Sequence, residues 1–134
     1  MVIITTLLDA ESHAIIQVYL QSDGAELVQE VLIDPQELEP ACKRLEVQEL
    51  LYDFAGFDAR IEFASGLVEQ TQIWVLPAGS GSGHRNFMPF GNFLDRSGLD
   101  GTGKLLLTTT GFTAVGTDQG SLLLRVRKRD YKPT

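Results

Sequence analysis

The sequence predicts an all-β fold, a single-domain β-sandwich or jelly roll of about eight strands with one long Gly-rich loop. Short runs of β-branched and apolar residues alternate with polar ones, and Gly-rich or Asp-containing turns separate these runs. Only one segment carries a helix-start signal. Residues 1–134 are expected to form one domain with a substantial core, because 43% of the chain is hydrophobic.

The first strands come from the N-terminal third of the chain. Residues 2–8 are mostly β-branched or apolar, which favours a strand. Residues 16–21 alternate apolar and polar side chains. The turn at 22–24 contains Asp-Gly, and a strand over 27–33 follows, so the pattern predicts a hairpin between these two strands.

One short helical turn is expected at residues 34–37. Asp34 can cap its first turn, and Pro40 interrupts it soon afterwards. The run 45–54 fits a helix or a strand by its spacing. A strand is favoured because Gly56 and a clearly alternating strand follow at once.

The remaining strands are expected in the second half. Residues 57–63 alternate strictly between apolar and polar side chains. The end of the run 67–76 is apolar on both faces, which predicts a central strand covered on both sides. Residues 104–110 and 121–129 supply the last two strands, and the apolar residues at alternate positions of 121–129 are expected to point inward.

The stretch Pro77–Gly103 combines seven glycines in 27 residues with several large apolar side chains. A flexible linker would lack the aromatics, and a core strand would not tolerate this much Gly. Long loops in compact domains are usually functional or disordered. We expect the stretch to be a loop that contacts another chain, because aromatic anchors carry much of the energy of an interface. The candidate contact residues are Phe87, Met88, Phe90 and Phe93.

Charge is unevenly distributed along the chain. The net charge of −7 argues against direct contact with nucleic acid. The last ten residues, RVRKRDYKPT, nevertheless hold five of the eleven basic residues and one of the eighteen acidic ones. Three interpretations stay open: a basic edge strand protected against aggregation, a docking strand for an acidic protein surface, or a phosphate contact. The candidate residues are Arg125, Arg127, Lys128 and Arg129.

Motifs for catalysis, cofactors and metals are each incomplete. Residues 98–105 nearly match a P-loop, but Leu105 replaces the required hydroxyl and a strand follows instead of a helix. His13 and His84 are expected on exposed loops, without the converging ligands of a zinc site. Cys42 is the single cysteine, expected to be buried and inert. The sequence therefore predicts no enzyme, no cofactor and no metal.

Neither a signal peptide nor a membrane-spanning segment is expected. The N-terminal residues lack a basic region and a cleavage site, and no apolar run reaches the length that spans a membrane. A single cysteine suits a protein made in a reducing cytosol.

A family resemblance covers residues 45–129. The succession of LEVQELLYDFAGFDARIEF, QIWVLPAG, a Gly-rich aromatic loop, GTGKLLLTTTGF and GSLLLRVRKRD resembles small structural proteins encoded beside the capsid genes of tailed bacteriophages. The resemblance implies a virion component without enzymatic activity, assembled in the host cytoplasm. Its expected partners are the major capsid protein or other virion proteins, and it is expected to form a homo-oligomer. A capsid decoration or cement role is favoured over a head–tail connector, neck or tail role.

A carbohydrate- or ligand-binding β-sandwich module is the competing class. It would use Trp74 or the loop aromatics as a platform for a sugar. Asp95 and Asp100 would lie near a calcium ion, although the spacing of a calcium-binding loop is absent.

Overall fold

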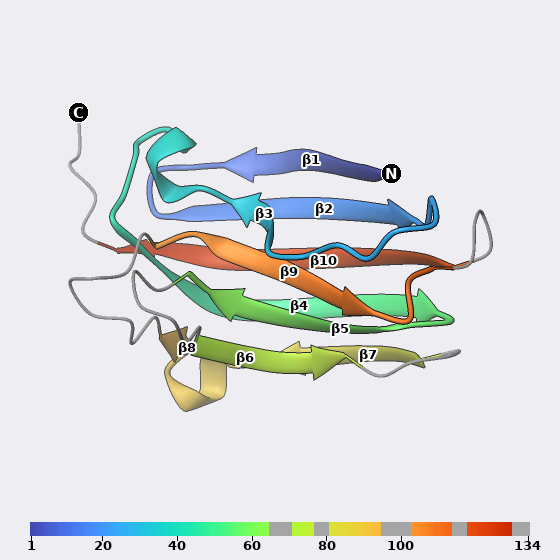
Figure 1. Cartoon of the computed structure of the whole chain (residues 1–134). Helices are drawn as coiled ribbons and strands as arrows, with labels where there is room; N and C mark the ends of the chain where they lie inside the picture. The colour runs from blue at the N-terminus through green and yellow to red at the C-terminus, as the bar shows by residue number, and fades with distance from the viewer. Residues whose placement is uncertain (65–70, 77–80, 95–102, 114–117, 130–134) are drawn as a thin grey trace.

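The computed structural model describes residues 1–64, 71–76, 81–94, 103–113 and 118–129, which form two antiparallel β-sheets packed face to face (Figure 1). The predicted all-β sandwich is confirmed. The strands of this described part are β1 (Val2–Asp9), β2 (His13–Gln21), β3 (Glu30–Ile33), β4 (Arg44–Ala55), β5 (Asp58–Phe63), β6 (Thr71–Leu76), β7 (Gly81–Asn86), β8 (Phe93–Leu94), β9 (Leu105–Thr110) and β10 (Gln119–Arg129). Two short 3-10 helices, η1 (Pro35–Glu37) and η2 (Met88–Phe90), complete it.

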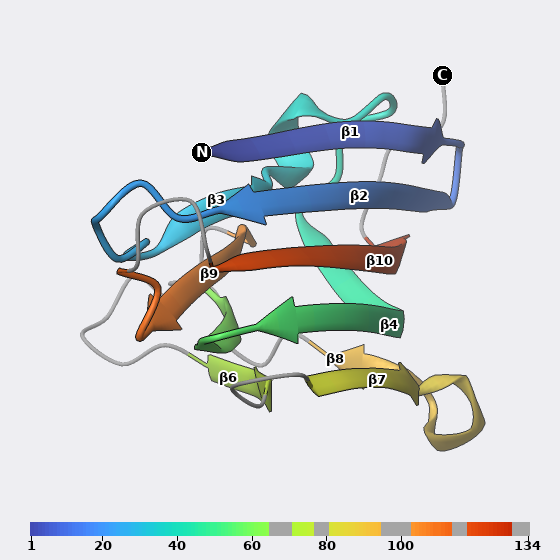
Figure 2. The same ribbon diagram turned by 90° about the vertical axis from the view of Figure 1, so that its right-hand side faces the viewer.

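The order of the strands decides which of them are exposed at an edge. The larger sheet runs β1-β2-β10-β4-β7, with β8 also pairing with β4. The smaller sheet runs β3-β9-β5-β6. Figure 2 shows the larger sheet as a stack from β1 to β7. β2, from the N-terminal part of the chain, and β10, from the C-terminal part, are neighbours within this sheet.

Side chains from the facing surfaces of both sheets form one core. The alternation in β10 places Leu122, Leu124 and Val126 inward and fully buried, as the sequence predicts. Ile61 and Phe63 of β5 meet them from the smaller sheet. Burial of an aliphatic or aromatic side chain of this size contributes about 1.5–3 kcal/mol, so this layer is the main source of stability.

A row of aromatic rings closes one end of the core. Phe57 lies between Phe54 and Phe112, with ring centroids 4.9 Å and 4.5 Å apart. Gly120 of β10 makes room for the row, because a Cβ atom at this position would lie 2.1 Å from Cδ1 of Phe54. A side chain at residue 120 would therefore displace the Phe54 ring.

A β-bulge at Gln48 explains the ambiguous pattern of residues 45–54. Arg125 of β10 pairs with Glu49 and Val126 pairs with Val47, so Gln48 is an extra residue in β4. The bulge shifts the alternation by one residue. Val47 before it and Leu50 after it therefore both reach the core, which a regular strand would not allow.

The predicted helical turn is confirmed as η1. The side chain of Asp34 accepts a hydrogen bond of 3.0 Å from the backbone N–H of Gln36, which caps the turn. The backbone returns to an extended conformation at Leu38. No helix in the described residues is long and apolar enough to cross a membrane.

The predicted hairpin between residues 16–21 and 27–33 is wrong. β2 belongs to the larger sheet and β3 to the smaller one, so the chain crosses between the layers after the Asp23-Gly24 turn. Two strands joined by a turn can pair with each other or pack in separate layers, and their sequence patterns are alike. The hairpin partner of β2 is β1, through the turn at residues 10–12.

Two further expectations are corrected by the strand order. β6 pairs with β5 at the end of the smaller sheet, so it is an edge strand of the described sheet and not the predicted central one. The stretch Pro77–Gly103 is not one long loop, because it contains β7, η2 and β8. Gly81 and Gly83 do not prevent β7 from pairing with β4, since an edge strand makes one ladder only.

Candidate functional site

The basic C-terminal strand lies inside the larger sheet. β10 pairs with β2 on one side and β4 on the other, so the interpretation as a protected edge strand is wrong. Its outward-facing arginines meet acidic residues of β4. Arg125 lies opposite Glu49, and Arg127 lies opposite Glu46. Opposite charges in facing positions of two strands are favourable. The carboxylates of Glu46 and Glu49 contact Arg129 and His84.

Glu46 of β4 contacts Arg129 at the end of β10. Its side chain is almost fully buried, with Oε1 lying 3.1 Å from a guanidinium nitrogen of Arg129. The Nδ2 group of Asn92 donates a hydrogen bond of 3.0 Å to Oε2 of Glu46. The guanidinium group of Arg129 therefore forms an ion pair within its own sheet. Arg127 is an exposed cation on the same face.

Lys128 cannot contribute to an outer surface of this chain, because its side chain is completely buried. Its Nζ lies 2.6 Å from Oδ1 of Asp9 and donates a hydrogen bond of 3.1 Å to the carbonyl oxygen of Pro40. The alternation of β10 turns Lys128 to the side opposite its neighbouring arginines. The prediction that Lys128 contacts a partner is therefore wrong. Lys128 instead links β10 to the end of β1 and to the segment before β4.

The four apolar residues predicted to contact a partner, Phe87, Met88, Phe90 and Phe93, behave as two pairs. Phe87 and Phe93 pack on the core and on each other, with ring centroids 5.5 Å apart in an edge-to-face arrangement. Met88 and Phe90 project from η2 towards solvent, and Phe90 is 85% exposed. Gly91 ends this turn with a φ of 84°, a conformation that favours glycine. Of the four, Phe90 and Met88 are therefore the residues available to another chain.

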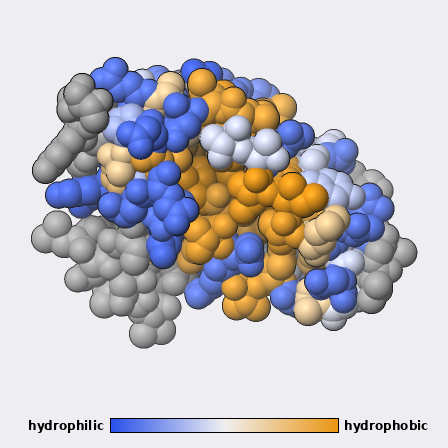
Figure 3. Space-filling view, turned by 90° about the horizontal axis from the view of Figure 1, so that it is seen from above, coloured by the Kyte–Doolittle hydropathy of each residue, from blue (hydrophilic) through white to orange (hydrophobic). Residues whose placement is uncertain are grey.

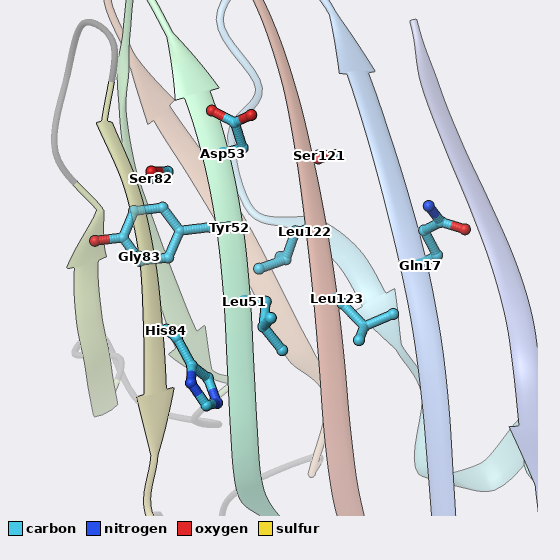
Figure 4. Close-up of a pocket in the computed structure, with 10 residues that line it drawn as sticks. All are labelled: Gln17, Leu51, Tyr52, Asp53, Ser82, Gly83, His84, Ser121, Leu122 and Leu123. Atoms are coloured by element: carbon cyan, nitrogen blue, oxygen red, sulfur yellow. The ribbon is translucent and has the colours of Figure 1, made fainter.

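A shallow depression of about 440 Å³ lies on the outer face of the larger sheet (Figure 4). Leu51 of β4 and Leu123 of β10 form its apolar centre, between His84 of β7 and Gln17 of β2. The Nε2 atom of His84 lies 2.7 Å from a carboxylate oxygen of Glu49. His84 is exposed, as predicted, but it lies within β7 and not in a loop.

Neither remaining candidate for chemistry forms a reactive centre in the described residues. His13 begins β2, and its Nδ1 lies 2.6 Å from Oγ of Ser12 in the preceding turn. Burial, together with the positive charges of Arg125 and Arg127, lowers the pKa of His13. Cys42 is buried, as predicted, and burial raises the pKa of its thiol, which keeps it protonated and unreactive.

Metal-binding residues do not converge in the part of the chain that the structure describes. Within it, no three His, Cys, Asp or Glu side chains are placed to hold an ion. Asp95, Asp100 and the side chain of Trp74 lie outside the described residues. These are the residues on which the predicted sugar platform and calcium site depend.

The edge strand β1 presents an apolar surface that the sequence did not single out. Ile3, Ile4, Leu7 and Leu8 are all between 38% and 53% exposed. Figure 3 looks onto this side of the molecule and shows an apolar band across it. The lack of alternation in VIITTLLD indicates a strand whose two faces are alike. Its place at an edge could not be read from the sequence, because it depends on the order of strands far apart in the chain.

A groove of about 270 Å³ runs beneath the inner face of β1. Ile4 and Thr6 line it from the larger sheet, and Val31 and Leu38 line it from the region of β3 and η1. Val31 is itself exposed. The groove exists because β3, at the edge of the smaller sheet, does not fully cover β1.

Comparison with known proteins gives no relative by sequence. No family model matches the chain, and no curated protein matches it. A conserved Klebsiella pneumoniae protein with a double-stranded β-helix domain is 9% identical, over 95% of this chain and 76% of its own, with a TM-score of 0.37. A cupin superfamily protein from Desulfitobacterium hafniense is 11% identical, over 97% and 79%, with a TM-score of 0.33. Likeness at this level carries no conclusion about function.

Proposed function

We propose that the protein is a non-enzymatic structural component of a tailed-bacteriophage virion, and that it decorates and cements the capsid shell. The observation that carries the proposal is the presence of apolar surfaces at both edges of the larger sheet. β1 lies at one edge, and the turn with Met88 and Phe90 follows β7 at the other. A chain with contact surfaces on opposite sides can bridge two neighbours, which is what a cement protein does.

The distribution of charge supports a role in protein contacts. The chain carries a net charge of −7, and Arg129 of β10 forms an ion pair with Glu46 of β4. An acidic body with the exposed Arg127 favours docking on a protein surface of complementary charge over docking on nucleic acid. The partner would be the major capsid protein or another virion protein, in particles assembled in the host cytoplasm.

The proposal is tested by the heat resistance of particles assembled with and without the chain. Particles that contain it should keep their DNA and shell to a higher temperature, because each bridge adds buried area between capsomers. Phe90→Ala should reduce both attachment and protection, while Val28→Ala, a change at another exposed apolar side chain, should preserve both. Equal heat resistance with and without the chain would exclude the cement role.

The place of the chain in the particle distinguishes the two structural roles. Density for the sandwich over the shell in a cryo-EM map would support decoration. Density at the connector, neck or tail would replace cementing with a role there and would keep the structural class. A purified chain that binds glycans, or gains thermal stability with calcium, would favour the ligand-binding class instead.

A further inference from the structure

We infer that β1 is a self-association strand, and that two copies of the chain pair antiparallel through β1 with Ile4 on the two-fold axis. This inference goes beyond the proposed function, since it concerns two copies of the purified chain and needs no other virion protein. It depends on the unprotected edge, on the direction of the backbone groups in β1 and on the distribution of charge around it.

Before its bulge between Thr6 and Leu8, β1 lacks the features that usually protect an edge strand. Residues 2–8 contain no charged residue and no proline, and the strand is eight residues long. Edge strands are normally short, charged, bulged or covered. The opposite edge, β7, has such protection, because it is rich in glycine and carries His84 and Arg85. β3, at an edge of the smaller sheet, has four residues and begins with Glu30.

The backbone of β1 offers hydrogen-bonding groups in a self-complementary pattern. Met1 and Gln21 exchange both backbone hydrogen bonds, at 2.7 Å and 3.0 Å. Hydrogen-bonded pairs alternate with non-hydrogen-bonded pairs along an antiparallel ladder. The N–H and C=O groups of Val2, Ile4 and Thr6 therefore point away from β2. The bulge between Thr6 and Leu8 comes only after these residues.

Only one symmetric register uses all of these free groups. With Ile4 opposite its own copy, Val2 lies opposite Thr6 of the second copy, and each of these pairs exchanges two hydrogen bonds. A register centred on Thr5 would set Ile4 opposite Thr6 and would leave Val2 opposite Leu8, beyond the bulge. The first register therefore joins the two larger sheets into one continuous sheet.

The side chains favour the same arrangement. Ile4 pairs with the fully buried Val18 of β2, so its side chain is on the inner face, where it lines the groove. In the dimer the two Ile4 side chains lie side by side above the two grooves. The exposed Val31 in each groove adds apolar area to the contact. A stable interface needs about 800 Å² from each partner, so the flanking apolar residues must contribute with the paired backbone.

Charge explains why the second strand is a copy of this chain and why the pairing is antiparallel. The two copies are equally acidic, so a contact between them requires a neutral strip such as residues 2–8. Asp9, which ends β1, and Asp34 and Glu37 are the acidic residues that line the groove. Antiparallel pairing about Ile4 keeps the two Asp9 residues about 34 Å apart, at ~3.4 Å per residue. Parallel pairing would bring these acidic ends together.

Sedimentation velocity on the purified full chain tests the inference. The wild type should sediment as a dimer of twice 14.7 kDa, and its affinity should change little with salt because the strip is uncharged. Ile4→Lys places two like charges near the axis, so it should weaken the dimer at least about 10-fold. Phe90→Lys, an equally drastic change at the opposite edge, should leave the dimer intact.

Cysteine cross-linking tests the register and does not depend on Ile4→Lys folding well. Under mild oxidation Ile4→Cys should form a covalent dimer, since facing Cα atoms in a hydrogen-bonded pair are about 5.5 Å apart. Thr5→Cys should not, because its two copies would be about 8 Å apart in this register. Cys42 is buried and does not interfere.

Three results would overturn the inference. They are a wild-type chain that stays monomeric at about 100 µM, a dimer that Ile4→Lys leaves unchanged, and equal cross-linking of Ile4→Cys and Thr5→Cys. A monomeric chain that pairs β1 with a strand of another protein would also overturn it.

A monomer that still protects shells from heat would leave the proposed function standing. A β1 dimer that never enters particles would exclude the proposed function and keep the inference.

Discussion

The Nζ atom of Lys128 lies 2.6 Å from Oδ1 of Asp9, and the lysine side chain has no exposed surface. Asp9 ends β1, and Lys128 belongs to β10, which is separated from β1 by β2 in the larger sheet. Oδ2 of the same aspartate accepts a hydrogen bond of 2.9 Å from the backbone N–H of Glu39. One buried ion pair thus holds together the first hairpin, the last strand and the segment that leads into β4.

Asp9→Asn, which removes the negative partner of this ion pair, should lower the free energy of unfolding. Asp9→Asn leaves the buried ammonium group of Lys128 without its counter-charge, and loss of one partner of a buried pair typically costs about 3–5 kcal/mol. Because the Asp9 side chain is itself partly exposed, we expect the lower part of that range. Lys128→Met removes the buried charge and should cost less. Urea unfolding curves of the two variants measure the difference.

Asp23→Asn is the matched control for this prediction, because Asp23 forms an ion pair on the exposed surface. Exposed pairs contribute about 0–1 kcal/mol. Equal free energies of unfolding for Asp9→Asn, Asp23→Asn and the wild type would show that the Lys128 pair does not stabilise the sandwich.

The stability of the fold should decrease in mild acid because of His13. Burial and the nearby Arg125 and Arg127 lower the pKa of His13 from its ordinary value of 6.5, so the unfolded chain binds this proton more readily. The free energy of unfolding is therefore unaffected by this group above pH 6.5 and falls as the pH drops below 6.5 towards the folded pKa. His13→Gln should lose less stability than the wild type between about pH 7 and pH 5.

Denaturant midpoints at several pH values measure this effect, with each protein compared with itself at high pH. His13→Gln also loses the hydrogen bond between His13 and Ser12, which changes stability at every pH. Comparing each protein with itself at high pH subtracts this constant difference. Identical pH slopes for His13→Gln and the wild type would contradict the prediction.

The sequence predicted the strands better than it predicted their neighbours. The alternation of β10 and the cap at Asp34 are local patterns, and the structure confirms both. The crossing from β2 to β3 and the central place of β10 depend on pairing between segments far apart in the chain. No local pattern encodes that choice, so the hairpin and the edge-strand interpretation were wrong.

The residues of the candidate contact surface could be predicted only in part, because their exposure also depends on the tertiary structure. Phe87 and Phe90 are aromatic residues in one short segment, yet Phe87 packs on the core while Phe90 faces solvent. The turn at η2, which ends at Gly91, decides between them. The sequence predicted β1 as a strand, but its exposure follows from its place at the edge of the larger sheet.

Cys42 should be protected from thiol reagents in the folded protein. Its side chain is buried and burial raises its pKa, so little reactive thiolate is present or accessible. Reaction with a chromogenic disulfide at pH 8 should be at least about 100-fold slower than in denaturant, because it requires an opening of the structure. A native rate equal to that of the unfolded chain would show that the segment before β4 is open.

The matched pair Phe90→Ala and Phe93→Ala should separate contact with partners from stability of the fold. Phe90 is almost fully exposed, so Phe90→Ala should change the free energy of unfolding by less than about 0.5 kcal/mol. Phe93 packs on the core and on the ring of Phe87, so Phe93→Ala should cost about 2 kcal/mol. Under the proposed function, binding to particles should show the reverse order, with Phe90→Ala the weaker binder when both variants are folded. Thermal unfolding and co-sedimentation with particles provide the two measurements. A Phe90→Ala variant that unfolds early and binds normally would place Phe90 in the fold and remove it from the contact surface.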